Sequence, residues 1–101
     1  MRSGPNFAGH MALIEIGCGT GCTVVYAGDV RTGQVFEFPR GGGRNLSLTL
    51  RHDVRSRALV AYWILEERCF REAFVWRGNE FGFLEKSDVG KAEVCWKLQT
   101  T

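Results

Sequence analysis

Long apolar runs are missing from this sequence. The longest unbroken one, Ala58–Leu65, is far shorter than the ~20 residues that a helix needs to cross a bilayer, so we expect no membrane span. A marked excess of charge is missing as well, because thirteen Lys and Arg stand against eleven Asp and Glu and the net charge is +2. Nucleic-acid binding requires a strongly basic face, so we expect no nucleic-acid partner.

A signal peptide is also missing, because residues 1–6 (MRSGPN) contain no apolar h-region. Two interpretations follow. Either the protein is cytosolic, or the sequence begins after a cleavage point with an added Met. We favour the second, and expect a periplasmic or secreted protein, because of the resemblance described below.

Material for a packed core is present. Apolar residues make up 45% of the chain, and seven Phe, three Trp and two Tyr provide large side chains to bury. This composition excludes a disordered chain. The length of 101 residues predicts a single domain over residues 1–101. Within it, residues 1–10 are expected to form an extended lead-in, because Pro5 and the nearby glycines are unfavourable inside a helix.

Helical periodicity longer than one turn is missing, whereas strand patterns recur between turn signals. They predict an all-β fold of about eight short, mostly antiparallel strands in a meander, sandwich or small barrel. Ala58–Leu65 is expected to be the central strand, and its aromatic and β-branched residues argue against the alternative, a helix over Arg57–Cys69. In the last strand, Trp96 is expected to point inward. The expected strands cover residues 11–17, 23–27, 34–38, 46–51, 58–65, 69–77, 81–84 and 92–98.

Four cysteines in an exported protein predict two disulfides, with three possible connectivities. A bridge between Cys18 and Cys22 would close the glycine turn, and one between Cys69 and Cys95 would join the last strand to its neighbourhood. Free buried thiols are one alternative, and a zinc site of Cys18 and Cys22 with His10 or Cys69 is another. A second closely spaced ligand pair is missing, and Cys-x-x-x-Cys is not the spacing of a redox dithiol, so we expect no metal and no cofactor.

Four segments of the sequence carry a resemblance to a known family. Residues 4–10 (GPNFAGH), 17–22 (GCGTGC) and 29–33 (DVRTG) resemble the N-terminal motif of an uncharacterised family of small exported bacterial proteins. Residues 74–81 (FVWRGNEF) are similar to that family's aromatic segment. The resemblance implies an envelope or secreted location and supports disulfides, but it supplies no activity. Size and compartment are also similar to those of periplasmic lysozyme inhibitors, whose Ser-Gly binding-loop motif is missing here.

Candidate catalytic groups are few. His10 could act as a base for a Cys18 or Cys22 thiol, but a turn histidine that satisfies backbone groups is the simpler interpretation. His52-Asp53 and Glu66-Glu67 are neighbours in sequence, and a solvated loop or turn accounts for each. We therefore expect a non-enzymatic protein with no catalytic residues.

Candidate binding residues are Arg40 and Arg44 of the glycine-rich loop 40–45, together with Trp63 and Trp76, because arginines and large aromatics dominate interface energetics. Our leading interpretation is a binding or inhibitor-like module that contacts a protein or an envelope glycan through loop 40–45 and the Cys18–Cys22 turn. A thiol- or metal-dependent enzyme centred on the Gly/Cys turn and a structural envelope module are the alternatives. Exposed edge strands would also permit a homodimer.

Overall fold

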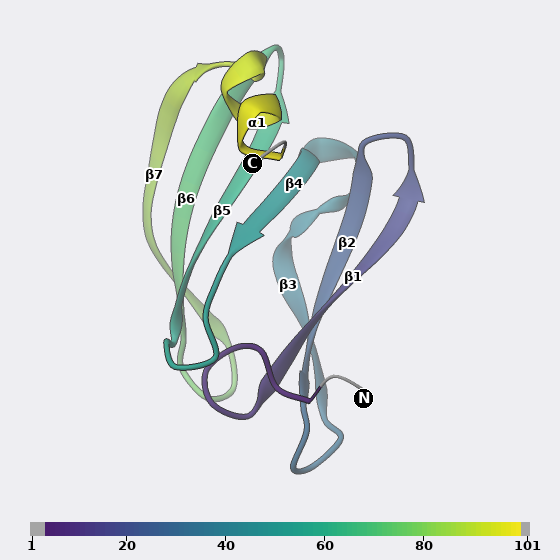
Figure 1. Cartoon of the computed structure of the whole chain (residues 1–101), viewed down its shortest axis with the longest axis vertical. Helices are drawn as coiled ribbons and strands as arrows, with labels where there is room; N and C mark the ends of the chain where they lie inside the picture. Colours follow the sequence, from purple (N-terminus) through teal and green to yellow (C-terminus); the bar gives the residue numbers. More distant parts are fainter. Residues whose placement is uncertain (1–3, 100–101) are drawn as a thin grey trace.

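Two antiparallel sheets face each other in the computed structural model, which describes residues 4–99 (Figure 1). The three-stranded sheet has the order β1-β2-β3, and the four-stranded sheet has the order β4-β5-β6-β7. The all-β prediction is confirmed. The elements are β1 (Met11–Gly19), β2 (Cys22–Asp29), β3 (Val35–Gly41), a 3₁₀ turn η1 (Gly42–Arg44), β4 (Leu46–Arg51), β5 (Ala58–Leu65), β6 (Arg68–Trp76), β7 (Phe81–Lys91) and α1 (Ala92–Gln99).

The last predicted strand is wrong, because residues 92–99 form α1 instead. The strand predicted over residues 81–84 is also too short, since β7 continues to Lys91. The apolar spacing in AEVCWKL fits both the two-residue period of a strand and the 3.6-residue period of a helix. In the helix, Ala92 and Cys95 are three residues apart and are buried together on one face. Trp96 is 52% exposed rather than inward-pointing. Residues 4–99 therefore form seven strands and one α-helix, besides the 3₁₀ turn η1.

The lead-in is less extended than expected. Phe7 forms an isolated antiparallel bridge with Met11 across a tight turn, and its ring is fully buried. The Ala8 N–H donates to the Ser56 carbonyl at 3.0 Å, which ties the lead-in to the β4–β5 connection. The first three residues of the predicted lead-in lie outside the described part of the chain.

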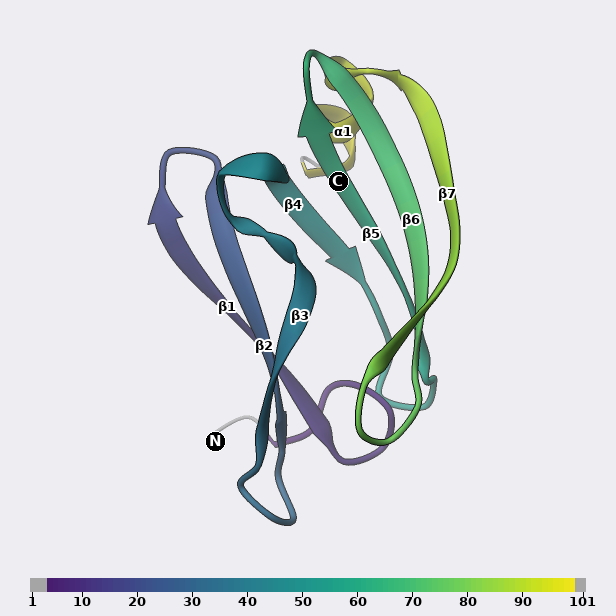
Figure 2. The same ribbon diagram turned by 180° about the vertical axis from the view of Figure 1, so that it is seen from behind.

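An aromatic core fills the space between the sheets. β5 lies inside the four-stranded sheet, as predicted, and turns Leu59, Ala61 and Trp63 toward this core, so the helix alternative is wrong. α1 packs on the opposite face of that sheet, against Ile64 and Cys69 (Figures 1 and 2). The core between the sheets includes Phe7, Met11, Val25, Phe38, Leu59, Ala61, Trp63, Phe74 and Trp76.

β3 departs from regular pairing beside β2. Val24 pairs with Gly41 and Tyr26 pairs with Glu37, so three residues of β3 oppose the single Val25. Pro39, which has no N–H to donate, lies in this bulge. Gly41 has φ 138°, and a Cβ built there would lie 2.7 Å from the Thr23 carbonyl oxygen. The bulge therefore requires glycine at position 41.

Gly41→Ala is expected to lower the free energy of unfolding by about 2–3 kcal/mol, because a side chain adds positive-φ strain and a backbone clash. Chemical denaturation of both forms measures the change. Gly43→Ala is the matched control, since a Cβ there meets nothing within 4 Å. Equal unfolding midpoints for the two variants would contradict the prediction.

Candidate functional site

The two segments predicted to bind a partner lie side by side at one end of the sandwich (Figure 1). The Ser47 N–H donates to the Gly21 carbonyl at 2.8 Å and so links the start of β4 to the β1–β2 turn. A Cys18–Cys22 disulfide closes that turn. We call residues 17–22 and 41–46 together the turn–loop surface.

Hydrogen bonds and the disulfide hold the turn–loop surface in one conformation. The Gly41 N–H donates to Asn45 Oδ1 at 2.9 Å, and the Asn45 N–H donates to the Gly42 carbonyl at 3.3 Å. The glycine-rich loop thus forms a hydrogen-bonded turn. Gly43, Arg44 and residues 17–21 are exposed. Arg44 is the one charged residue of segments 17–22 and 41–46, and the exposed Leu46 adds apolar area to the same surface.

Arg40 points away from the turn–loop surface toward the second sheet. Its Nε and Nη2 donate to the two carboxylate oxygens of Glu72, at 2.6 and 2.8 Å. Glu72 has no exposed area, and its Oε1 also accepts a hydrogen bond from Trp63 Nε1 at 2.6 Å. The arginine side chain is 31% exposed and lies over the Phe74 ring. This ion pair connects β3 to β6 across the sandwich.

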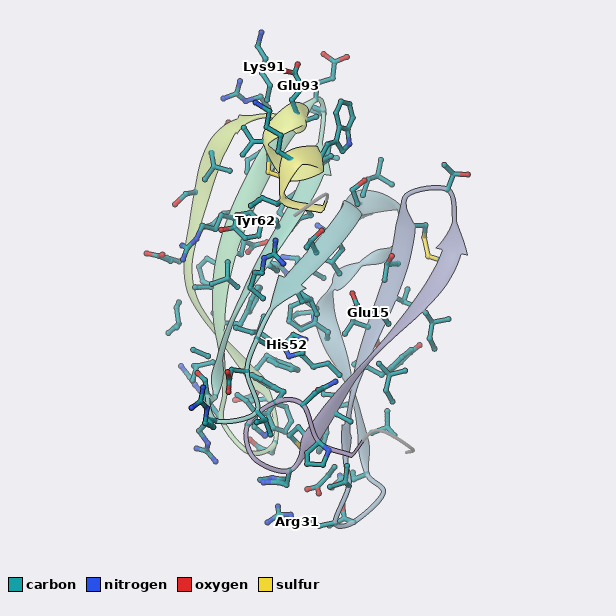
Figure 3. All side chains as sticks on the ribbon, in the orientation of Figure 1. Glu15, Arg31, His52, Tyr62, Lys91 and Glu93 are labelled. Carbon is teal, nitrogen blue, oxygen red and sulfur yellow. A yellow bond between two sulfur atoms is a disulfide. The ribbon has the colours of Figure 1, made fainter. Side chains whose placement is uncertain are left out.

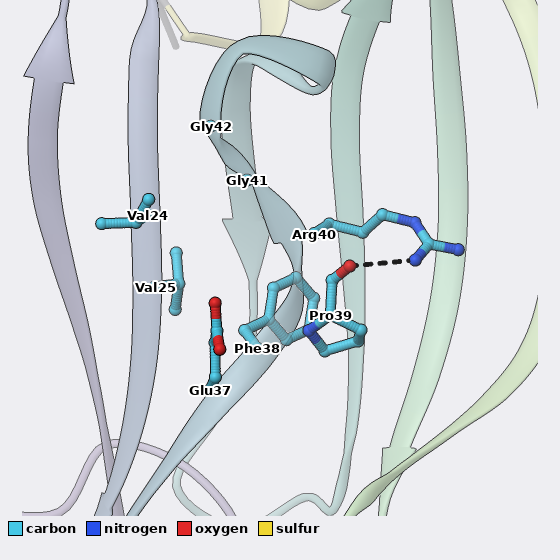
Figure 4. Close-up of a pocket in the computed structure, with 8 residues that line it drawn as sticks. All are labelled: Val24, Val25, Glu37, Phe38, Pro39, Arg40, Gly41 and Gly42. Carbon is cyan, nitrogen blue, oxygen red and sulfur yellow. Dashed lines mark hydrogen bonds between the residues drawn. The ribbon is translucent and has the colours of Figure 1, made fainter.

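A pocket of about 280 Å³ lies beside the β3 bulge (Figure 4). Glu37, Phe38 and Pro39 form part of its wall, while the Arg40 side chain extends away toward the second sheet and donates from Nη1 to the Pro39 carbonyl at 3.0 Å. The guanidinium is therefore engaged on three sides by Glu72, Pro39 and the Phe74 ring.

The four predicted binding residues occupy different environments. Arg44 is exposed on the turn–loop surface, and Arg40 is committed to Glu72. Trp63 and Trp76 are almost fully buried in the core. Glu72, which sequence reasoning did not select, had one visible signal: it interrupts the otherwise apolar face of Phe70, Phe74 and Trp76.

Both predicted disulfides are confirmed, as Cys18–Cys22 and Cys69–Cys95. His10 lies in the turn just before β1, with its Nε2 3.8 Å from Asp29 Oδ2, whereas Cys18 lies near the far end of that strand. Among residues 4–99, no three His, Cys, Asp or Glu side chains are grouped to hold a metal ion. The geometry therefore does not assemble the thiol or zinc site that the sequence left open.

The side chains of His52 and Asp53 also have different hydrogen-bond partners. His52 Nδ1 lies 3.0 Å from the Asn6 carbonyl oxygen. Asp53 accepts hydrogen bonds from the Arg55 side chain and backbone N–H, and these bonds hold the pKa of Asp53 below its usual value. Each residue thus serves a different loop contact.

Glu66 and Glu67 form a two-residue turn between β5 and β6. Both have positive φ, 52° and 65°, as a type I′ hairpin turn requires. Asn-Gly is the favoured sequence for this turn, because residues with a long side chain are strained in the left-handed region. Two glutamates at these positions are therefore unfavourable for stability.

The double substitution Glu66→Asn with Glu67→Gly is expected to raise the free energy of unfolding by about 1–2 kcal/mol, because Asn and Gly both suit the left-handed conformation. Thermal and chemical unfolding measure the gain. Glu66→Gln with Glu67→Gln removes the same charges and keeps the strain, so this control should change little. An equal gain in both variants would assign the effect to charge instead.

Comparison with known proteins found no match: the chain matches no protein-family model, no curated protein sequence and no solved structure. Within residues 4–99, α1 and η1 are both too short to cross a membrane as helices.

Proposed function

We propose that this chain is a non-enzymatic binding module that contacts a protein partner through the turn–loop surface. The observation that supports the proposal most directly is the hydrogen bond from the Ser47 N–H to the Gly21 carbonyl, which joins the disulfide-closed turn to the η1 loop. Two exposed segments that are distant in sequence thereby form one continuous surface.

Rigidity favours binding by this surface. Association loses less conformational entropy when loops are already held in one conformation. Here a disulfide fixes the β1–β2 turn, and Asn45 fixes the loop that follows β3. The surface can thus bind a partner without first being ordered.

A protein is favoured over a glycan by the composition of the surface. Residues 17–22 and 41–46 contain no aromatic residue on which a sugar ring could stack. They offer instead exposed backbone, the Arg44 guanidinium and the exposed side chain of Leu46. Arginine beside a small apolar area is common at protein interfaces.

The proposed location is the bacterial periplasm or the secreted fraction. Two disulfides support an oxidising compartment, because reducing compartments keep thiols free. The resemblance of residues 4–10 and 17–22 to a family of exported bacterial proteins is the second support for this assignment.

Site-specific photocrosslinking tests the proposal. Benzoylphenylalanine replaces Thr20 in the β1–β2 turn or, as the control, Thr32 in the β2–β3 turn at the opposite end (Figure 1). Incubation with bacterial envelope extract should yield a discrete adduct from position 20 only. Arg44→Glu should reduce its yield about fivefold or more, whereas Arg57→Glu, just before β5, should leave it unchanged.

The nature of the adduct decides between partners. Digestion by a proteinase, with resistance to a muramidase, supports a protein partner. An adduct that collapses on muramidase treatment identifies a glycan and overturns the protein assignment. Equal crosslinking from both ends, or no adduct at position 20, contradicts a specific turn–loop surface.

A further inference from the structure

A second concave site lies where the β5–β6 turn meets α1. The pocket has a volume of about 450 Å³, and we call it the turn–helix pocket. Lys91 and Glu93 project at this end of the molecule (Figure 3). The side chains that matter for its chemistry are Glu66, Glu67, Arg68, Lys91, Glu93 and Trp96.

Negative charge predominates in the turn–helix pocket. Three carboxylates line it, together with two cations, Arg68 and Lys91. Arg68 is already paired, because its Nη2 lies 2.9 Å from Asp88 Oδ1 and its Nε donates to both Asp88 oxygens. The same guanidinium holds the pKa of Asp88 below its usual value, so the pair remains ionised. Lys91 then opposes three glutamates, and the pocket keeps a negative excess.

Trp96 gives the pocket an aromatic wall. Its side chain is 52% exposed, whereas Trp63 and Trp76 are buried in the core. A cation over an indole ring is attracted by the electron density of the ring face. The chain already contains such a contact, since Lys86 Nζ lies 5.0 Å from the Trp63 ring centre. An exposed indole beside carboxylates is suited to ammonium and guanidinium groups.

The two walls of the pocket are held together before any ligand binds. The Ala92 N–H donates to the Glu67 carbonyl at 2.9 Å, which joins the start of α1 to the turn. The Cys69–Cys95 disulfide joins the same helix to the start of β6. The positive φ values of Glu66 and Glu67 are a local cost in stability, and strained residues of this kind are concentrated at functional sites.

We propose that the turn–helix pocket binds a Lys or Arg side chain from a basic segment of a partner polypeptide. The cationic group lies over the Trp96 indole, and the carboxylates of Glu66, Glu67 and Glu93 accept its hydrogen bonds. A polypeptide is the chosen source because the pocket is open at the surface and carries several carboxylates, which suits consecutive basic residues. This site does not depend on the turn–loop surface.

Fluorescence titration with tetra-arginine amide tests the proposal in the whole protein. Trp96 is the exposed indole, so a saturable change in the emission at long wavelength is expected, and Trp96→Phe should abolish that change. Glu66→Gln with Glu93→Gln should weaken binding about tenfold or more. Glu15→Gln with Glu37→Gln, two exposed carboxylates of the first sheet, removes the same charge and should leave the dissociation constant unchanged.

Other peptides and ligands complete the test. Tetra-citrulline amide, which keeps the shape of arginine without the charge, should not bind. Equal weakening by the two double variants would show unspecific attraction and overturn the site. Stronger binding of free spermidine than of the peptide would replace the polypeptide by a small amine, and saturable binding of a neutral oligosaccharide alone would replace it by a sugar. Absence of any saturable change also overturns the proposal.

Discussion

Arg40→Ala is expected to lower the free energy of unfolding by about 3 kcal/mol, because it leaves the Glu72 carboxylate buried without its cation. Glu72 has no exposed area from which to reach water, and two of its hydrogen-bond donors belong to Arg40. Of the three side-chain hydrogen bonds to Glu72 within residues 4–99, only the one from the Trp63 indole would remain. Chemical denaturation measures the loss.

Three variants separate the causes of that loss. Arg40→Lys keeps the positive charge but cannot form the bidentate pair with Glu72, so an intermediate loss of stability is expected. Arg40→Met with Glu72→Leu removes both charges and should recover most of the stability, except for about 1 kcal/mol from the lost Trp63 hydrogen bond. A double variant less stable than Arg40→Ala would contradict the argument. Because Arg40→Ala disturbs the core, Arg44 is the position at which partner binding is tested.

Cys69→Ala with Cys95→Ala is expected to lower the free energy of unfolding by about 3.5 kcal/mol, against about 2 kcal/mol for Cys18→Ala with Cys22→Ala. The difference follows from loop length, since the sequence separations are 26 and 4 residues. The larger loss also releases α1, whose Ala92 and Cys95 cover Ile64 and Tyr62. Chemical unfolding and the far-ultraviolet helix signal measure both effects.

The two disulfides should also differ in how readily they are reduced, because they differ in exposure. Cys18 is exposed, while Cys69 and Cys95 have no exposed area. Mild reductant followed by alkylation and peptide mass mapping should therefore label Cys18 and Cys22 first. Simultaneous labelling of all four cysteines, or equal losses of stability for the two pairs, would contradict this account.

Strand positions were predictable where burial alternates along one face. Leu46–Arg51 and Ala58–Leu65 have the predicted bounds, because a half-buried and a fully buried strand leave distinct patterns. Residues 92–99 were not predictable by this argument, since their apolar spacing fits a strand and a short helix equally. The continuation of β7 was hidden by Asp88, whose side chain accepts from the Gly90 N–H within the strand instead of forming a turn.

The candidate sites were predictable only in part. Loop 40–45 and the Cys18–Cys22 turn were both selected from glycine and cysteine content, but their contact depends on the pairing of Gly21 with Ser47 across 26 residues. The charge of Glu72 on an apolar face was visible, but its partner Arg40 is 32 residues away. Local patterns do not encode such distant pairings, which depend on how the two sheets pack.

Both covalent cross-links lie at the same end of the sandwich, beside the β1–β2 turn and α1 (Figures 1 and 3). The opposite end, with the β2–β3 turn and the 77–80 turn, is held by packing and hydrogen bonds. Partial unfolding should therefore begin there. Backbone amides around residues 29–35 are expected to exchange their hydrogen for deuterium sooner than those around 18–22 and 92–95. The end that carries both proposed binding surfaces would then keep its shape while the far end opens.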